Sequence, residues 1–418
     1  MREMKDSGVE WIGEIPKDWK ILQVKYLFYI GRGRVIAQGE LEDDGKYPVF
    51  SSQTKNNGCL GFINTFDFDI DQLTWTTDGA NAGTVFLRSG KHNCTNVCGT
   101  LKPIERVIDL KYQKYVLEHI AYYHKRADTN GYKIMNNEMA VIKTILPLLQ
   151  DQHRIADYLD TKCTKIDAII DREHNVIEKL KEYKLSLITE AVTKGLNPDV
   201  PMKDSGVEWI GEMPEGWKLR KLNSITKKII DGTHNTPNYQ IDGIPFLRVT
   251  DITSSDGINR NIDWDNTAYI SIDEHIELAK RCNPQKGDLL VSKNGTIGVP
   301  KIINWENVFS IFVSLCLIKV LNIIKVEYLY YYFKSSLIWT EIAIGGRTGT
   351  ITNLHLEKIK EFKIPLPPIS EQTQIADYLE NKCNGIDSAI AKKQLVIDKL
   401  IEYKKSLIYE VVTGKKEV

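Results

Sequence analysis

The residues of this 418-residue chain with the clearest chemical potential are His92, Cys94 and Cys98, in the stretch HNCTNVC. Imidazole and thiolate groups can bind zinc, but a structural zinc site needs four ligands and no second cluster completes this one. We therefore expect no metal site and interpret the cysteines as buried apolar residues of a strand-rich region. The seven cysteines are an odd, scattered set, which predicts a reducing, cytoplasmic location rather than a disulfide framework.

Other catalytic motifs are incomplete or absent in the sequence. The stretch GGRTGT at residues 345–350 lacks the lysine and the spacing of a phosphate-binding loop, and no GxGxxG follows a predicted strand. Two Glu-Tyr-Lys triplets, at residues 182–184 and 402–404, lie on polar helix faces and are interpreted as solvated charges rather than as a metal-nuclease motif. The eight histidines form no recognisable Ser/His/Asp arrangement.

The sequence thus predicts no catalytic residue and no cofactor bound by this chain, and it favours a protein that recognises a partner. An enzyme with an unrecognised site in the stretch TTDGANAG, at residues 76–83, is the competing interpretation.

Length and composition limit the possible architectures. The chain is long enough for two domains with separate cores, and its hydrophobic fraction of 42% is that of a globular protein. No apolar run approaches the ~20 residues of a membrane span and the N-terminus does not look like a secretory leader, so we expect no membrane association. The net charge of zero counts mildly against a stand-alone nucleic-acid binder, but it allows one whose positive charge is local or supplied by a partner subunit.

The chain is a tandem duplication with fixed ends and free middles. MKDSGVEWIGEIP at residues 4–16 returns at residues 202–214 with a single change, Ile15 to Met213. Residues 151–170 and 177–193 return, with more changes, at 371–390 and 397–413. The middles, residues 21–146 and 219–364, share almost nothing that can be aligned by eye. A repeat of this length is not a solenoid.

The repeated C-terminal segments predict two long helices with narrow apolar stripes. Apolar side chains recur there at steps of three and four residues, and charges fill the other faces, which is typical of a coiled coil. We expect the two helices to form an antiparallel pair. The alternative is that each helix caps its own domain. The stripe residues are Ile155, Leu159, Ile166, Ile170, Ile177, Leu180 and Leu187 in the first helix and Ile375, Leu379, Ile386, Ile390, Ile397, Leu400 and Leu407 in the second.

The middles consist mainly of predicted strands and turns, each followed by a tyrosine-rich helix. The predicted fold class is α+β, with two pseudo-symmetric mixed α/β domains separated by two long helices that form an antiparallel coiled coil. The expected boundaries are residues 1–150 for the first domain, 151–195 for the central helix, 196–369 for the second domain and 370–418 for the C-terminal helix.

Several motifs together resemble the specificity subunit of type I restriction–modification systems. The opening SGVEWIGEIP occurs twice and is followed by Trp19 and Trp217. IPLPPISEQTQIADYL closes the second half, and LPLLQDQHRIADYL is its weaker counterpart in the first. DGTHNTP at residues 231–237 and GRTGTITNLHLEKIKEFKIPLP also have the look of this family. The first half lacks a GGRTGT counterpart, so its DNA-facing loops are harder to assign.

The resemblance implies a subunit without catalysis of its own. Two target-recognition domains would each read one half of a split, asymmetric site in double-stranded DNA. The paired helices would set the spacing and dock two methyltransferase subunits, which carry S-adenosylmethionine and methylate adenine. With motor–nuclease subunits, which use ATP and magnesium, the complex would cleave unmodified DNA. The alternative is a coiled-coil DNA-binding protein without a methyltransferase partner.

Loop residues that can donate and accept hydrogen bonds at fixed geometry are the candidates for base reading. Many of them could equally form turns, where Asn, Asp and Gly adopt positive φ. The candidates are Gln53, Lys55, Asn56, Asn57, Thr77, Asp78 and Asn81 in the first domain and His234, Asn235, Arg248, Lys293, Asn294, Thr296 and Arg347 in the second. Candidate phosphate contacts are Arg32, Arg34, Lys227, Lys228 and Lys293.

Overall fold

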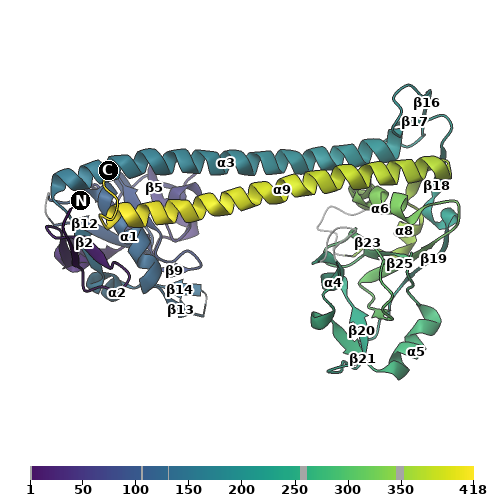
Figure 1. The fold of residues 1–418 in the computed structure, drawn as a ribbon, viewed down its shortest axis with the longest axis horizontal. Helices are drawn as coiled ribbons and strands as arrows, with labels where there is room; N and C mark the ends of the chain where they lie inside the picture. The colour runs from purple at the N-terminus through teal and green to yellow at the C-terminus, as the bar shows by residue number, and fades with distance from the viewer. Residues whose placement is uncertain (1, 105–106, 130, 255–260, 345–352) are drawn as a thin grey trace. The chain divides into compact units, whose positions relative to one another are not determined.

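The computed structural model describes residues 2–104, 107–129, 131–254, 261–344 and 353–418 (Figure 1). Contacts divide the chain into two compact units. Unit 1 consists of Met1–His174 and Gln394–Val418, and unit 2 of Asn175–Lys393. Each unit therefore contains one of the two middles together with parts of both long helices, α3 (Leu149–Lys194) and α9 (Ile369–Val412).

The repeated thirteen residues form the same small hairpin in each unit. In unit 1, β1 (Met4–Asp6) pairs antiparallel with β2 (Glu14–Pro16); in unit 2, β16 (Met202–Asp204) pairs with β17 (Glu212–Pro214). Gly8 and Gly206 follow the first strands with φ of 65° and 72°, a conformation that favours glycine. The carboxylate two residues earlier accepts each glycine N–H at 2.9 Å, so an identical sequence gives an identical turn.

We call the repeated segments of the chain the frame. A two-stranded antiparallel sheet joins each variable middle to this frame. In unit 1, β3 (Lys20–Gln23) pairs with β15 (Lys143–Leu146). In unit 2, β18 (Lys218–Lys221) pairs with β26 (Lys363–Leu366). The limits at which the two sequences stop resembling each other are thus a structural junction.

The middles fold into the same four-stranded antiparallel sheet although their sequences cannot be aligned by eye. The strand order is β4-β12-β8-β10 in unit 1 and β19-β25-β22-β23 in unit 2. The unit 1 strands are β4 (Phe28–Arg32), β8 (Gln72–Thr76), β10 (Val85–Arg88) and β12 (Cys98–Pro103). The unit 2 strands are β19 (Thr226–Asp231), β22 (Leu289–Ser292), β23 (Pro300–Ile302) and β25 (Leu315–Val320). This shared sheet confirms the predicted pseudo-symmetry.

The remaining elements differ only in part between the units. Unit 1 adds a sheet of order β6-β5-β11-β7, a sheet of order β13-β14-β9 and the short helix α2 (Asn136–Val141). Their strands are β5 (Tyr47–Phe50), β6 (Cys59–Ile63), β7 (Phe68–Asp69), β9 (Asp78–Gly79), β11 (Lys91–Cys94), β13 (Arg126–Asp128) and β14 (Gly131–Lys133). Unit 2 adds β20 (Ile244–Leu247), β21 (Ala268–Ile270), β24 (Ser310–Ile311), α4 (Val249–Thr253), α5 (Ile272–Arg281), α7 (Leu337–Ala343) and α8 (Leu356–Lys360). The strand order β6-β5-β11 of unit 1 matches β21-β20-β24 of unit 2, with one antiparallel and one parallel pairing in each.

The tyrosine-rich helices, α1 (Leu110–His124) and α6 (Val326–Lys334), bind the ends of the long helices. In unit 1, the buried Tyr112 hydroxyl donates to the carbonyl of Val412 at the end of α9, at 3.2 Å. In unit 2, the buried Tyr328 hydroxyl lies 3.1 Å from the carbonyl of Val192, near the end of α3, and 2.7 Å from that of Pro365. Carbonyls in the last turn of a helix have no partner within the helix, and these hydroxyls reach them.

A buried glutamine holds the first turn of each long helix. Gln152 accepts the N–H of Asp109 at 2.9 Å and donates to the carbonyls of Val107 and Pro147 at 3.2 and 3.0 Å. Gln372 repeats the pattern with Lys325, Ile323 and Pro367, at 2.8, 3.1 and 2.8 Å. Each glutamine side chain thereby provides hydrogen-bond partners for main-chain groups near the start of a tyrosine-rich helix and in the loop before a long helix.

The long helices run antiparallel within each unit. In unit 2, Lys184 of α3 contacts Asp387 of α9 at 2.7 Å, and in unit 1 the equivalent Lys404 contacts Asp167 at the same distance. Farther along unit 2, the end of α3 reaches the start of α9, because a Cβ at Gly195 would lie 2.9 Å from Oε1 of Glu371. The predicted antiparallel coiled coil is confirmed.

The stripe residues serve both of the roles considered for them. Ile155, Leu159 and Ile166 belong to the core of unit 1, beside Leu407 from the opposite end of the chain. Unit 2 is arranged in the same way, with Ile375 and Leu379 in its core. The helices thus cap the domains and pair with each other. Buried stripe residues are Ile155, Leu159, Ile166, Ile177, Ile375, Leu379, Ile386, Ile397 and Leu407, and half-buried ones are Ile170, Leu180, Leu187, Ile390 and Leu400.

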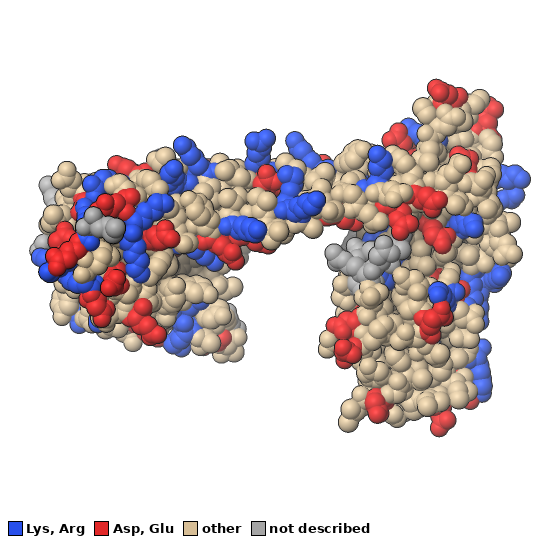
Figure 2. Space-filling view, in the orientation of Figure 1, with Lys and Arg blue, Asp and Glu red and all other residues tan. Residues whose placement is uncertain are grey.

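The outer surface of the long helices is charged. Figure 2 shows Lys and Arg side chains along α3 and α9 with Asp and Glu side chains between them. No helix in the described part of the chain combines the length and apolar character needed to cross a bilayer.

The two copies provide matched variants for a buried indole. Trp217 Nε1 donates to Glu371 at 3.0 Å, whereas Trp19 Nε1 is buried without a partner among the described residues. The residue equivalent to Glu371 is Asp151, which is one methylene shorter and contacts Arg154 at 2.6 Å.

We expect Glu371→Asp to leave Trp217 Nε1 unpaired and to lower the free energy of unfolding of unit 2 by about 1–3 kcal/mol. Asp151→Glu should raise that of unit 1, because it offers Trp19 an acceptor. Hydrogen exchange against denaturant, which follows each unit separately, would measure both. Unchanged stability in Glu371→Asp would contradict this account.

Equivalent leucines of the two long helices should differ in their importance. Leu407 is only 2% exposed in the core of unit 1, whereas Leu187 is half-buried against the core of unit 2. Leu407→Ala should lower the free energy of unfolding of unit 1 by about 2–5 kcal/mol, because it leaves a cavity. Leu187→Ala should cost unit 2 less, and equal losses in the same exchange measurement would show that the difference in burial is unimportant.

Candidate nucleic-acid interface

The structure brings together the two loops predicted to read DNA in the first domain. They are loop A, residues 51–58, and loop B, residues 76–83. Ser52 Oγ lies 3.3 Å from an Asp78 carboxylate oxygen, and Asn81 Nδ2 donates to the Thr54 hydroxyl at 3.4 Å. Two loops that lie apart in the sequence are therefore in contact.

Loop A exposes three of its predicted readers. Lys55, Asn56 and Asn57 are exposed, and the two asparagines have positive φ of 50° and 53°. Their backbone conformation is that of a turn, which was the alternative interpretation of these residues, while their side chains face solvent. Gln53 is half-buried and donates from Nε2 to the carbonyl of Cys59, so its amide supports the loop.

Arg88, which sequence reasoning missed, holds loop A from below. Its side chain is 2% exposed and donates to the Thr74 hydroxyl at 3.0 Å and to the Asn57 carbonyl at 2.7 Å. The guanidinium lies 3.6 Å from the ring centroid of Phe50. Burial lowers the pKa of Arg88 to about 10, so it remains a cation at neutral pH. The available signal was an arginine at the end of an otherwise apolar strand.

Loop B exposes Asn81 and half-exposes Asp78, but it does not expose Thr77. Thr77 is buried and its hydroxyl donates to the carbonyl of Val97 at 3.0 Å. The prediction of Thr77 as a direct reader is therefore corrected, because this hydroxyl is used inside the domain.

Loop B has a structural equivalent in the second domain, loop C, at residues 292–298. The Thr76 hydroxyl accepts the N–H of Thr84 at 3.1 Å, and the Ser292 hydroxyl accepts that of Val299 at 2.8 Å. Loop C exposes Thr296 and half-buries Asn294. The two loops were predicted independently, and the structure assigns them to the same place on the shared sheet.

The prediction of Lys293 as a reader of bases and a phosphate contact is also corrected. Its side chain is 6% exposed and Nζ lies 3.0 Å from the carboxylate of Asp231, so this ammonium is not presented to a base or a phosphate. His234 contacts the same carboxylate at 3.1 Å but is 65% exposed, and Asn235 is exposed as well.

Arg248 lies near Lys293 although the two residues are distant in sequence. It precedes α4, its side chain is 40% exposed, and Nε lies 3.5 Å from Asp251. Ser314 links the segments, because its hydroxyl accepts the N–H of Val249 at 3.2 Å and its carbonyl accepts that of Lys293 at 2.9 Å. Arg347 lies outside the described residues.

The predicted phosphate contacts differ in whether their positive charge is exposed or already paired within the domain. Arg32 and Lys227 are exposed, and the exposed Lys228 donates to the carbonyl of Arg281 at 2.6 Å. Arg34 is paired with Glu40 at 2.9 Å and with Asp67 at 3.2 Å, so its charge is largely balanced within the domain.

The zinc-like residues are part of the first domain's interior. His92 is buried between Gln72 and the Gly90 carbonyl, at 2.9 and 2.8 Å, and Cys94 and Cys98 are buried. Within the described ranges, no group of three or more potential ligands is placed to hold a metal ion.

Comparison with known proteins agrees with this arrangement. A type I restriction enzyme specificity subunit of Methanocaldococcus jannaschii, MjaVIII, is 24% identical over 428 residues, which cover 96% of this chain and 93% of that protein. The MpnII specificity subunit of Mycoplasma pneumoniae is 38% identical over 171 residues, which cover 40% of this chain and 51% of that protein. A chain from a solved structure of the type I R-M system shares the fold, with a TM-score of 0.69 at 13% identity and coverage of 95% and 98% of the two chains.

The family model for the type I restriction modification DNA specificity domain matches residues 16–181 and again residues 214–397. These matches cover most of the chain and include both middles and most of the long helices. The chain therefore belongs to the family of type I restriction–modification specificity subunits and contains two DNA specificity domains.

Proposed function

We propose that this chain selects a split, asymmetric site in double-stranded DNA, with one half-site read by each domain. The observation that carries the proposal is that loops B and C occupy equivalent positions on the equivalent sheets of the two domains but present different side chains. A common backbone position would place both domains against DNA in the same way, and different side chains would select different bases.

The exposed loop residues have the chemistry that base recognition needs. Lysine and arginine donate to guanine, asparagine pairs with adenine, and threonine contacts either. The exposed or partly exposed candidates are Lys55, Asn56, Asn57, Asp78 and Asn81 in the first domain and His234, Asn235, Arg248, Asn294 and Thr296 in the second. We assign supporting roles to Gln53, Thr77 and Lys293, because their polar groups are bonded within the domain.

The repeated frame supports docking of two equivalent methyltransferase subunits. Two identical partners need two equivalent surfaces, and the long helices offer matched exposed groups, such as Tyr183 and Tyr403, with exposures of 55% and 54%. In this proposal S-adenosylmethionine is bound by the methyltransferase subunits, and ATP with magnesium by motor–nuclease subunits. The chain itself contributes recognition to both adenine methylation and restriction, and no catalytic group.

Exchange of one middle tests the proposal. Residues 24–142 would be replaced by the corresponding segment of another specificity subunit, with β3 and β15 retained so that the junction sheet stays intact. The chimera would be produced with its methyltransferase partner, and the methylated motif would be mapped by methylation-sensitive sequencing of the host genome.

We expect one half of the methylated motif to change while the other half stays the same, because each domain has its own core and its own loops. Exchange of residues 222–362 is the matched control and should change the other half only. A change of both halves in either chimera would contradict independent reading.

A further inference from the structure

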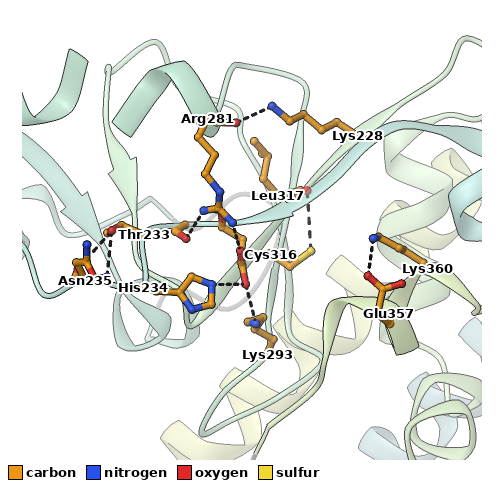
Figure 3. Close-up of polar contacts among 12 residues, drawn as sticks. Lys228, Thr233, His234, Asn235, Arg281, Lys293, Cys316, Leu317, Glu357 and Lys360 are labelled. Atoms are coloured by element: carbon orange, nitrogen blue, oxygen red, sulfur yellow. Dashed lines mark hydrogen bonds and ion pairs between the residues drawn. The ribbon is translucent and has the colours of Figure 1, made fainter. Parts of the chain in front are cut away.

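The stretch DGTHN, residues 231–235, is organised around one buried carboxylate. Asp231 ends β19, and its side chain is 3% exposed. It is contacted by three nitrogen-bearing side chains from separate parts of the second domain: Arg281 at the end of α5, Lys293 after β22, and His234 (Figure 3). A buried carboxylate needs such partners, and these contacts hold three separate segments of the domain together around Asp231.

The donors approach different atoms of Asp231. Arg281 Nη2 donates to Oδ1 at 2.7 Å, and Lys293 Nζ donates to Oδ2 at 3.0 Å. Arg281 Nη1 also donates to the main-chain carbonyls of Asp231 and Gly232, at 3.0 and 2.8 Å. One arginine thus holds both the side chain and the backbone where the chain leaves the sheet.

The next two residues give the stretch its shape. A Cβ at Gly232 would overlap the carbonyl of Ile311, so only glycine allows this close passage of two backbones. The Thr233 hydroxyl accepts the N–H of Asn235 at 3.2 Å, which closes a turn around His234. The backbone that carries His234 is therefore fixed on both sides.

The charges keep Asp231 ionised. Burial opposes ionisation, but the hydrogen bonds from Arg281 and Lys293 and the nearby positive charges outweigh it and hold the pKa of Asp231 below its usual value. An ionised carboxylate only accepts hydrogen bonds. His234 Nε2, 3.1 Å from Oδ2, must therefore carry the proton of that contact.

This contact determines what His234 offers to a ligand. A neutral imidazole with its proton on Nε2 has an unprotonated Nδ1, which accepts hydrogen bonds. The ring is 65% exposed, and within the described residues no group donates a hydrogen bond to Nδ1. In the major groove, the groups that donate to such an acceptor are the amino groups of adenine and cytosine.

The first domain has different chemistry at the equivalent place. Gly33 makes the same close passage after β4, against the carbonyl of Cys94, and the residue before it is Arg32 rather than an aspartate. Arg32 is exposed, and its Nη2 lies 3.4 Å from the hydroxyl of Thr77, the position equivalent to Lys293. One domain has an outward cation where the other has a buried anion.

We propose that Asp231, Arg281 and Lys293 form a clamp that presents Nδ1 of His234 as a hydrogen-bond acceptor, with which the second domain reads an exocyclic base amino group in its half-site. The clamp residues are positioning residues, and His234 makes the contact. This inference rests on the proposed function, because it needs the second domain to face DNA.

The test uses the full-length chain in complex with its methyltransferase partner. Methylation of duplex oligonucleotides is first measured for the wild type, and the half-site changed by exchange of residues 222–362 is assigned to the second domain. Absence of any bipartite motif with the wild-type complex would refute the proposed function itself, before any variant is compared.

The decisive measurement couples one protein group to one DNA group. Each adenine or cytosine of the second half-site, except the adenine that accepts the methyl group, is replaced in turn by an analogue that lacks the amino group. At one position we expect the wild type to lose about 5–10-fold in methylation rate at limiting DNA, as for one lost hydrogen bond. His234→Ala should lose a similar factor on normal DNA and nothing further on that analogue. If His234→Ala and the wild type respond alike at every position, the assignment of His234 is wrong.

The clamp is tested by Asp231→Asn, which should relax discrimination at the same base position and leave the first half-site unchanged. Glu357→Gln is the matched control: it removes the carboxylate of an exposed ion pair with Lys360 in the same domain, and it should behave as the wild type. If Asp231→Asn loses recognition of both half-sites through unfolding, Arg281→Lys replaces it, since it keeps the charge but loses the paired donors. Full discrimination in the folded clamp variant would overturn the proposal.

Discussion

Each domain core is closed by helix ends that come from opposite halves of the chain. The Tyr112–Val412 and Tyr328–Val192 hydrogen bonds mark these closures, and the apolar residues around them belong to the two main cores. This interlock explains why the frame is repeated so faithfully. A change in one copy of the frame alters a surface against which the other copy packs, whereas a change in a middle stays within one domain.

The middles show how far a fold can be kept while its chemistry changes. The two four-stranded sheets keep their strand order because backbone hydrogen bonds and a buried apolar face define it, and many apolar sequences satisfy both. The loops at one edge of these sheets keep only a few backbone-directed contacts, such as those of the Thr76 and Ser292 hydroxyls. Other loop positions carry different side chains, such as the exposed Lys55 and Asn81 in the first domain and the exposed His234 and Thr296 in the second.

The long helices, their stripes and the existence of two pseudo-symmetric domains could be predicted from the sequence, because apolar periodicity and repetition are local signals. The shared sheet could not be predicted by comparing the middles, since it depends on pairing between segments far apart in the chain. Thr77 and Lys293 were wrongly predicted as readers because their surroundings also depend on segments far apart in the chain. Their burial depends on partners such as Val97 and Asp231, and no local pattern reveals these partners.

The division into units has a consequence for biosynthesis. Unit 2 is one continuous segment, Asn175–Lys393, whereas unit 1 needs both Met1–His174 and Gln394–Val418. A ribosome delivers Leu407, Val411 and Val412 after the whole of unit 2, and these residues belong to the core of unit 1. Unit 1 therefore starts to form before unit 2 but can complete its core only after it, and the nascent first domain keeps an apolar surface open until α9 emerges.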